Sequence, residues 1–306
     1  MKNIGSVLPF IPKPKKKAVS ASSNRQLQII NLSGIIAEQT REESNELGFM
    51  SRLLVMVNLP YREPGKDKKV WIRKNGKVSI VIASAYDKEG ISLGIPYGTY
   101  PRLILAYLVT QAVKTQSPVI YLGKSFSHFL QLLNIKRGGK QYKQLNKQLE
   151  RTLSASFSWM YETNHQRSRA NIHVSSQSQL WWDEKVPEEQ FLLESYIRLN
   201  TDFFNEITNN AVPLDLRVLS TLKNSPLGLD LYMFIVWRVY KIEKPVVISW
   251  EGLQQQLGGQ YSDIKEFARD CRTHIKRIKA LRPDLNINCV KGRLCLNPLF
   301  LSKISG

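Results

Sequence analysis

One order of sequence signals occurs twice along this chain of 306 residues. Each copy has a long apolar helix, a short β-branched strand and a short helix that ends near a glycine pair, Gly138-Gly139 or Gly258-Gly259. A basic amphipathic helix follows each pair, and candidate hairpin strands follow that helix. Because a short turn with glycine can set one helix across another, the sequence predicts two helix-turn-helix units, each followed by a hairpin.

The predicted elements have a similar order in the two copies. In the first copy they span 102–114, 119–121, 125–133, 140–153, 156–163, 171–175 and 191–199. In the second copy they span 227–239, 246–248, 250–257, 262–281, 285–289 and 293–296. Ahead of both, the pattern predicts a helix within 26–50 and paired strands at 53–57 and 78–83. This order describes an α+β chain with two tandem winged helix-turn-helix domains.

The length also favours two domains, at about 150 residues per domain. We expect a basic tail and short helix at 1–48, a first winged-helix domain at 49–200 and a second at 201–306. The tail combines prolines, like charges and serines at 11–23 without apolar periodicity. Burial there cannot offset the entropy lost on ordering, so the tail is expected to be flexible.

The charge of the chain points to an anionic partner. Lysine and arginine number 44 against 25 acidic residues, which gives a formal net charge of +19. Such a surplus attracts phosphate backbones or acidic membrane surfaces. No run approaches the about 18 apolar residues of a membrane helix, and the first ten residues lack a secretory signal. We therefore expect a cytoplasmic protein without a membrane partner, and reduced core thiols at Cys271, Cys289 and Cys295.

The first basic helix separates two kinds of side chain. At about 100° per residue, one narrow stripe is apolar and consists of Tyr142, Leu145, Leu149 and Leu153. The opposite side gathers cations and amides, namely Lys140, Lys143, Gln144, Lys147 and Arg151. Such a helix can pack through its leucines and offer its polar side to a major groove, where lysine or arginine can bind guanine and glutamine can bind adenine.

The second basic helix has the same division. Its apolar stripe consists of Ile264, Phe267, Ala268, Cys271, Ile275 and Ile278. Its cationic flank consists of Lys265, Arg269, Arg272 and Lys276. Any surface helix in a protein this basic would turn lysines outward, so each helix alone leaves a merely solvated face as an alternative. The recurrence of the pattern, each time after a glycine pair, favours double-stranded DNA as the partner.

The predicted hairpins carry further cations near their tips. These are Arg167 and Arg169 in the first copy, and Lys291 and Arg293 around a glycine in the second. One interpretation is contact with the DNA backbone or minor groove. The other is that these side chains only solvate a turn.

Signatures of enzyme chemistry are incomplete. Gly123-Lys124-Ser125 matches the end of a phosphate-binding loop, but Pro118 stands where that motif needs its first glycine. The four histidines form no His-x-His pair of the kind that holds a metal beside a nucleophilic tyrosine. We therefore expect no enzyme, with no catalytic residues, no cofactor and no metal site.

Several longer motifs lie within the two copies. They are GIPYGTYPRLILAY at 94–107, LGKSFSHFL at 122–130, SPLGLDLY at 225–232 and ISWEGLQQQLG at 248–258. Together with 214–222, these stretches resemble the plasmid-encoded RepA replication initiator family over about 53–300.

The resemblance implies sequence-specific binding of double-stranded DNA at repeated plasmid origin sites, which initiates replication and controls copy number. It also implies contact with host replication proteins and, by analogy with related initiators, a homodimer. A winged-helix transcriptional repressor with the same helices and no role in replication is the alternative reading of the same residues.

Overall fold

The computed structural model describes residues 29, 31–36, 38–39, 43–56, 58–65, 67–123, 125–163, 165–180, 195–258, 260–290 and 292–299. The expected flexible tail at 11–23 falls outside the described residues. The helix predicted within 26–50 is present at 31–36. No helix in these described stretches is both long and apolar enough to cross a membrane.

Six elements of the first predicted copy form one group, which we call the first unit. They are α3 (Thr99–Thr115), β4 (Val119–Tyr121), α4 (Phe126–Leu132), α5 (Gly139–Ser154), β7 (Ser175–Gln179) and β8 (Tyr196–Leu199). β8 pairs with both β4 and β7, so the sheet order is β4-β8-β7. The hydroxyl of Ser125 accepts a hydrogen bond from the backbone N–H of His128 and caps the start of α4.

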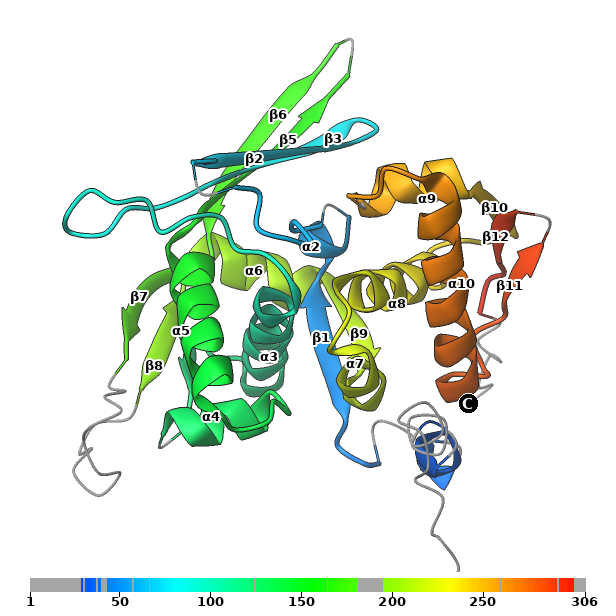
Figure 1. The fold of residues 1–306 in the computed structure, drawn as a ribbon, viewed down its shortest axis with the longest axis horizontal. Coiled ribbons are helices and arrows are strands. Elements are labelled where there is room, and N and C mark those ends of the chain that lie inside the picture. Colours follow the sequence, from blue (N-terminus) through cyan, green and yellow to red (C-terminus); the bar gives the residue numbers. More distant parts are fainter. Residues whose placement is uncertain are drawn as a thin grey trace, which may run out of the picture.

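The second unit repeats this arrangement. It consists of α8 (Pro226–Val239), β10 (Val246–Ser249), α9 (Trp250–Leu257), α10 (Ile264–Leu281), β11 (Ile287–Val290) and β12 (Arg293–Leu296). Its sheet order is β10-β12-β11, so the strand ahead of the short helix again lies beside the last strand. In Figure 1, α5 and α10 lie on opposite sides of the view. The predicted order of helix, strand, short helix and basic helix therefore occurs in both copies.

The two helix-turn-helix turns use different residues. α9 ends at Gly258, whose φ of 72° is left-handed and whose N–H donates to the Gln254 carbonyl. In the first unit the left-handed residue is Asn134, with φ of 53°, just after α4. Gly138 instead has an extended φ of 162° and precedes α5 as its N-cap. Of the two glycine pairs, left-handed backbone therefore occurs at Gly258 and not at Gly138, while Gly259 lies outside the described residues.

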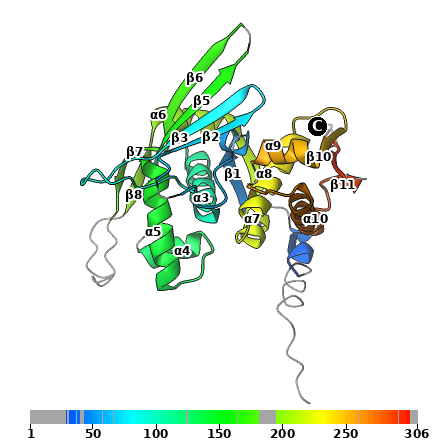
Figure 2. The same cartoon turned by 45° about the horizontal axis from the view of Figure 1, so that its top comes forward.

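A four-stranded antiparallel sheet lies beside the first unit. Its order is β2-β3-β5-β6, formed by β2 (Val70–Asn75), β3 (Val78–Ala83), β5 (Ser156–Glu162) and β6 (Arg167–His173). Figures 1 and 2 show it at the top of the molecule, with β5 and β6 extending farthest. The predicted hairpin after α5 therefore exists, but it belongs to this sheet. The hairpin that completes the first unit is β7–β8.

The segment ahead of this sheet differs from expectation. Residues 53–57 were predicted as a strand paired with 78–83, but they fall largely in α2 (Arg52–Met56), and β3 pairs with β2 and β5. The reason is that a short run of consecutive apolar residues has no periodicity that separates a strand from a buried helix. The strand here is β1 (Leu47–Ser51), within the stretch predicted as helix.

Three further elements connect the units. They are α6 (Thr201–Asn210), β9 (Ala211–Asp215) and α7 (Leu216–Leu222). β9 pairs antiparallel with β1, which joins segments from both halves of the chain. One contiguous cluster of buried apolar side chains spans both units, with α3 and α8 at its centre. The division into domains at residue 200 stays a prediction.

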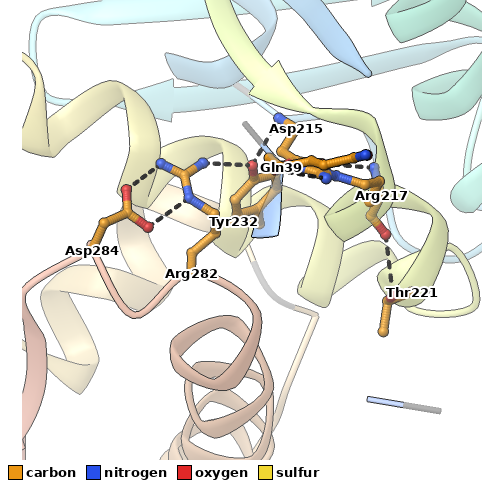
Figure 3. A network of polar contacts seen from close by, with 7 residues as sticks. All are labelled: Gln39, Asp215, Arg217, Thr221, Tyr232, Arg282 and Asp284. Carbon is orange, nitrogen blue, oxygen red and sulfur yellow. Dashed lines mark hydrogen bonds and ion pairs between the residues drawn. The ribbon is translucent and has the colours of Figure 1, made fainter. Parts of the chain in front are cut away.

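A polar network ties the end of α10 to the centre of the fold (Figure 3). The Arg282 guanidinium, which follows α10, binds the Asp284 carboxylate and donates to the Tyr232 hydroxyl at 3.5 Å. That hydroxyl accepts from the backbone N–H of Asp215 at 2.9 Å. The Asp215 carboxylate in turn pairs with Arg217 at 2.7 Å. Because all of these groups except the exposed Asp284 are buried, and because they are mutually hydrogen-bonded, the network stabilises the position of α10 against α8 and β9.

Candidate nucleic-acid interface

α5 turns its apolar stripe inward and most of its cations outward. Leu145 and Leu149 are completely buried. The four other residues predicted to face a groove are accessible, with exposed lysines and a half-buried amide: Lys140, Lys143, Lys147 and Gln144. The helix wheel therefore places these four side chains correctly, and their contact with DNA stays a prediction.

Arg151 does not lie on the exposed side of α5, so the orientation predicted for it is wrong. Its Nε donates to the Leu93 carbonyl at 2.5 Å and its Nη1 to the Ile95 carbonyl at 3.3 Å. Its Nη2 lies 2.9 Å from Oε1 of Glu63, and its guanidinium lies 5.5 Å from the ring of Tyr97. Only 7% of the residue is exposed. Arg151 therefore holds the segment ahead of α3 against α5.

α10 has an accessible cationic face along its whole length. The apolar stripe is buried, with Phe267 and Ile278 completely so. The four predicted cations are all exposed: Lys265, Arg269, Arg272 and Lys276. The Arg272 guanidinium lies 5.2 Å from the ring of Trp250 in α9, which limits its freedom. Asp263 caps the helix by accepting from the backbone N–H of Lys265 at 2.8 Å.

The predicted hairpin cations separate into three cases. Arg293 is exposed at the start of β12, beside the β11–β12 turn. Lys291 lies outside the described residues. Arg167 and Arg169 lie on β6 in the four-stranded sheet, and Arg167 pairs with Glu162. These two arginines therefore lie on the predicted hairpin, β5–β6, but β5 also pairs with β3, so this hairpin belongs to the four-stranded sheet and not to the first unit.

The segment between α2 and β2 contacts both units. The Asn58 amide and the Tyr61 hydroxyl donate to the carbonyl of Leu257, at the end of α9, at 3.2 and 3.3 Å. The backbone N–H of Arg62 donates to the Gln260 side chain in the turn before α10. No periodic signal marks this segment, because its contacts are with residues almost 200 positions away. It is a structural feature that reasoning from the sequence missed.

Glu63, in the same segment, is an acid beside the cations of α5. Its Oε1 lies 3.7 Å from Nζ of Lys147 and 2.9 Å from Nη2 of Arg151. Its Oε2 accepts from the Tyr97 hydroxyl at 3.4 Å. Burial alone would raise the pKa of the Glu63 carboxyl, but the hydrogen bond from Arg151 and the charges of Arg151 and Lys147 lower that pKa below 4.5. The segment thus links α5 to the turn before α10.

The cysteines differ in accessibility. Cys271 is buried on the inner stripe of α10, and burial raises the pKa of its thiol. Cys295 is half-buried. Cys289 is exposed on β11, so the prediction that all three are core thiols is wrong for this residue. Alternation along β11 puts Cys289 on the same face as the completely buried Ile287, so alternation does not account for its exposure.

Both units present a positively charged helix after a turn, next to a hairpin. This arrangement can place side-chain donors against base edges and lysines against phosphates. Within the described part of the chain, no three histidine, cysteine or acidic side chains converge as metal ligands do.

Comparison with known proteins gives a family and a fold. A family model described as plasmid-encoded RepA protein matches residues 95–252, more than half of the chain. A crystal structure of domains 2 and 3 of RctB, in selenomethionine form, aligns with a TM-score of 0.51 at 14% identity, covering 78% of this chain and 94% of that one. A second RctB structure of the same domains aligns with a TM-score of 0.49 at 14% identity, covering 79% and 94%.

At this identity the likeness to RctB concerns the mixed helix and sheet fold alone. No curated protein sequence matches the chain. The family match covers the first unit and, in the second unit, α8, β10 and the start of α9. The chain belongs to the family of plasmid-encoded RepA proteins.

Proposed function

We propose that this protein is a plasmid replication initiator that binds double-stranded DNA at repeated origin sites. Each unit acts as a winged helix-turn-helix domain, with α5 and α10 as the helices that enter the major groove. The hairpins β7–β8 and β11–β12 act as wings, which contact the backbone or minor groove. Membership of the plasmid-encoded RepA family supports the replication role.

The observation that carries the proposal is the recurrence of one exposed cationic helix face in two units of the same topology. On α5 this face includes Lys143 and Lys147, and on α10 it includes Arg269 and Arg272. In both helices the opposite side is buried, and these four cations lie on the accessible side. A net charge of +19 gives the electrostatic attraction that brings such faces to a phosphate backbone.

The buried connections between the units add support. Arg102 on α3 binds Asp230 on α8, and the segment with Asn58 and Tyr61 binds the end of α9. Because the units are joined by buried contacts, α5 and α10 have a fixed spacing. A fixed spacing suits a protein that reads two groove segments of one repeat.

The test is DNase footprinting of the purified protein on the DNA that flanks its gene, followed by affinity measurements on the protected repeat. Two double variants remove charge from the proposed faces: Lys143→Ala with Lys147→Ala, and Arg269→Ala with Arg272→Ala. We expect each double variant to weaken binding at least tenfold. Each removes two cations from the groove, and a good contact between a side chain and a base is worth roughly 1–3 kcal/mol.

The matched control removes two exposed lysines outside the proposed faces. Lys241→Ala with Lys244→Ala changes the charge by the same amount in the turn between α8 and β10. If the control weakens binding as much as the face variants, the proposed contact surface is wrong. A plasmid maintenance assay with the same variants separates an initiator from a repressor, since only an initiator variant loses the plasmid.

A further inference from the structure

A pocket of about 340 Å³ lies between the start of α3 and the first turns of α5. One wall is the backbone around Gly98, Thr99 and Tyr100, and the other consists of side chains of α5. It therefore adjoins the proposed reading helix, and its α5 wall includes two residues of the predicted DNA-facing set, Lys140 and Gln144.

The α3 wall presents free backbone donors. α3 is 17 residues long and begins at Thr99, and no side chain caps it. The N–H groups of Thr99 and Tyr100 have no acceptor within the helix, and Pro101 has no N–H. The helix dipole adds partial positive charge at this end. Gly98 precedes the helix with φ 79° and ψ −156°, a conformation essentially restricted to glycine, so no Cβ stands at the entry to these donors.

The α5 wall contains a buried amide without an acceptor. Gln148 is 1% exposed and lines the pocket. Its Oε1 accepts from the backbone N–H of Tyr97 at 3.0 Å, which fixes the orientation of the amide. Its Nε2 has no hydrogen-bond partner among the described residues. Buried polar groups are normally hydrogen-bonded, so this donor is available to an acceptor that enters the pocket.

The charged side chains that line this pocket and the one beside it are lysines. Lys140 is exposed at its rim. An adjoining pocket of about 290 Å³ shares Thr99 and Tyr100 and adds Lys136 and Lys223. Burial and the nearby charge of Lys136 lower the pKa of the Lys223 ammonium, as expected where two cations face one space. Glu63, the acid in the segment between α2 and β2, is already paired with Lys147 and Arg151 of α5.

We propose that this pocket binds a phosphate, and that this phosphate is one backbone phosphodiester of the DNA strand next to the groove that α5 enters. The inference rests on the proposed function and extends it to a site that the groove-facing side chains do not define. Two helix N–H groups, the Gln148 amide and Lys140 supply the donors and the charge that a phosphate needs. The contact fixes the register of α5 on the DNA, since backbone contacts position a reading helix.

Thr99→Glu is the informative variant. A carboxylate at the first position of α3 suits the helix dipole and preserves folding, but it puts negative charge where the phosphate would bind. Thr99→Gln is the neutral control of similar size. We expect Thr99→Glu to weaken binding of the footprinted repeat about tenfold or more without lowering the melting temperature, and Thr99→Gln to have less than a threefold effect. Lys140→Ala should reduce the log-log salt slope by about 1.

Repeats carrying a single neutral methylphosphonate at successive positions identify the contact. At one position the modified DNA should bind wild-type protein more weakly and should abolish the difference between wild type and Thr99→Glu. If no position couples to Thr99→Glu or Lys140→Ala while the variants of the α5 face still lose binding, the phosphate pocket is wrong and the proposed function stands. If wild-type protein protects no DNA, the proposed function itself fails.

Titration with inorganic phosphate and with pyrophosphate distinguishes a free anion from the DNA backbone. Binding of either anion by wild type but not by Thr99→Glu, combined with the absence of methylphosphonate coupling, would overturn the assignment to DNA. Coupling at one DNA position, with competition by the free anion only at high concentration, supports it.

Discussion

Arg102 of α3 and Asp230 of α8 form a doubly hydrogen-bonded ion pair inside the protein, with Nε–Oδ1 at 2.6 Å and Nη2–Oδ2 at 2.7 Å. Both side chains are almost completely buried. The guanidinium also donates to the carbonyls of Leu59, Pro60 and Gly98, so its hydrogens are well satisfied. Because α3 and α8 are the first helices of the two units, this pair fixes one unit against the other.

Replacing Asp230 with alanine should destabilise the protein by roughly 3–5 kcal/mol, because it leaves the Arg102 guanidinium buried without its counter-charge. Urea unfolding followed by circular dichroism measures the change in the free energy of unfolding. The double variant Arg102→Met with Asp230→Leu is the control and should lose less than Asp230→Ala, since it removes both charges. Equal losses for the two variants would contradict the buried pair as the cause.

The elements that the sequence predicts well are those with strong local signals. The periodic stripe that includes Leu145 and Leu149 locates α5, and alternating and β-branched residues locate β4, β10 and β12. Pairings between distant strands carry no such signal. β1 pairs with β9, which lies about 160 residues away, and Phe49 is opposite Pro213. No local pattern in either segment identifies the other as its partner.

The candidate site shows the same division between local and long-range information. A helix wheel places Lys143 on the outer side of α5 correctly. It cannot show whether other segments of the chain cover the same side farther along the helix. Arg151 shares the cationic side in the wheel and is nevertheless buried, because Glu63 and the Leu93 carbonyl pack over it. The buried Gln148 was equally invisible, since its burial depends on the start of α3.

Replacing Glu63 with glutamine should have opposite effects on stability and on DNA binding. The lowered pKa of the Glu63 carboxyl means that its ion pairs stabilise the folded state fully above about pH 4.5, and that this stabilisation is lost as pH falls through the lowered pKa. Glu63→Gln should therefore be less stable than wild type at pH 7, and this difference should shrink as the pH is lowered through the pKa of the carboxyl. Urea unfolding over a series of pH values measures this difference.

The same substitution should raise affinity for nonspecific DNA a few-fold at pH 7. Removing the carboxylate frees Lys147, which lies 3.7 Å from it, to bind a phosphate. Fluorescence anisotropy with a DNA of unrelated sequence measures the effect. Glu89→Gln, which neutralises an exposed acid paired only with Lys88, serves as the control for net charge. An equal gain for the control would mean that overall charge, and not the release of Lys147, is responsible.

Alkylation should distinguish the thiols by accessibility. Burial raises the pKa of both thiols, but Cys289 is exposed on β11, whereas Cys271 is buried. Because the reactive species is an accessible thiolate, iodoacetamide should modify Cys289 at least tenfold faster than Cys271 in the folded protein. Mass spectrometry of timed digests follows both sites. Cys289→Ser should remove the fast phase, and modification of both thiols at one rate would mean that α10 does not pack as described.

DNA binding should depend strongly on salt, because the proposed interface places two cationic helices and two hairpins against the phosphate backbone. A protein that neutralises 6–10 phosphates gives a log-log slope of affinity against salt with a magnitude of about 5 to 9. Anisotropy titrations of the footprinted repeat between 50 and 300 mM salt, a range chosen to keep screening moderate, measure the slope.

Lys265→Ala with Lys276→Ala, on the exposed face of α10, should reduce the magnitude of this slope by about 2, because each lysine neutralises one phosphate. The control Lys241→Ala with Lys244→Ala should leave the slope unchanged. A slope near zero for wild type would mean that phosphate contacts do not drive association, and the positive faces of α5 and α10 would then need another partner.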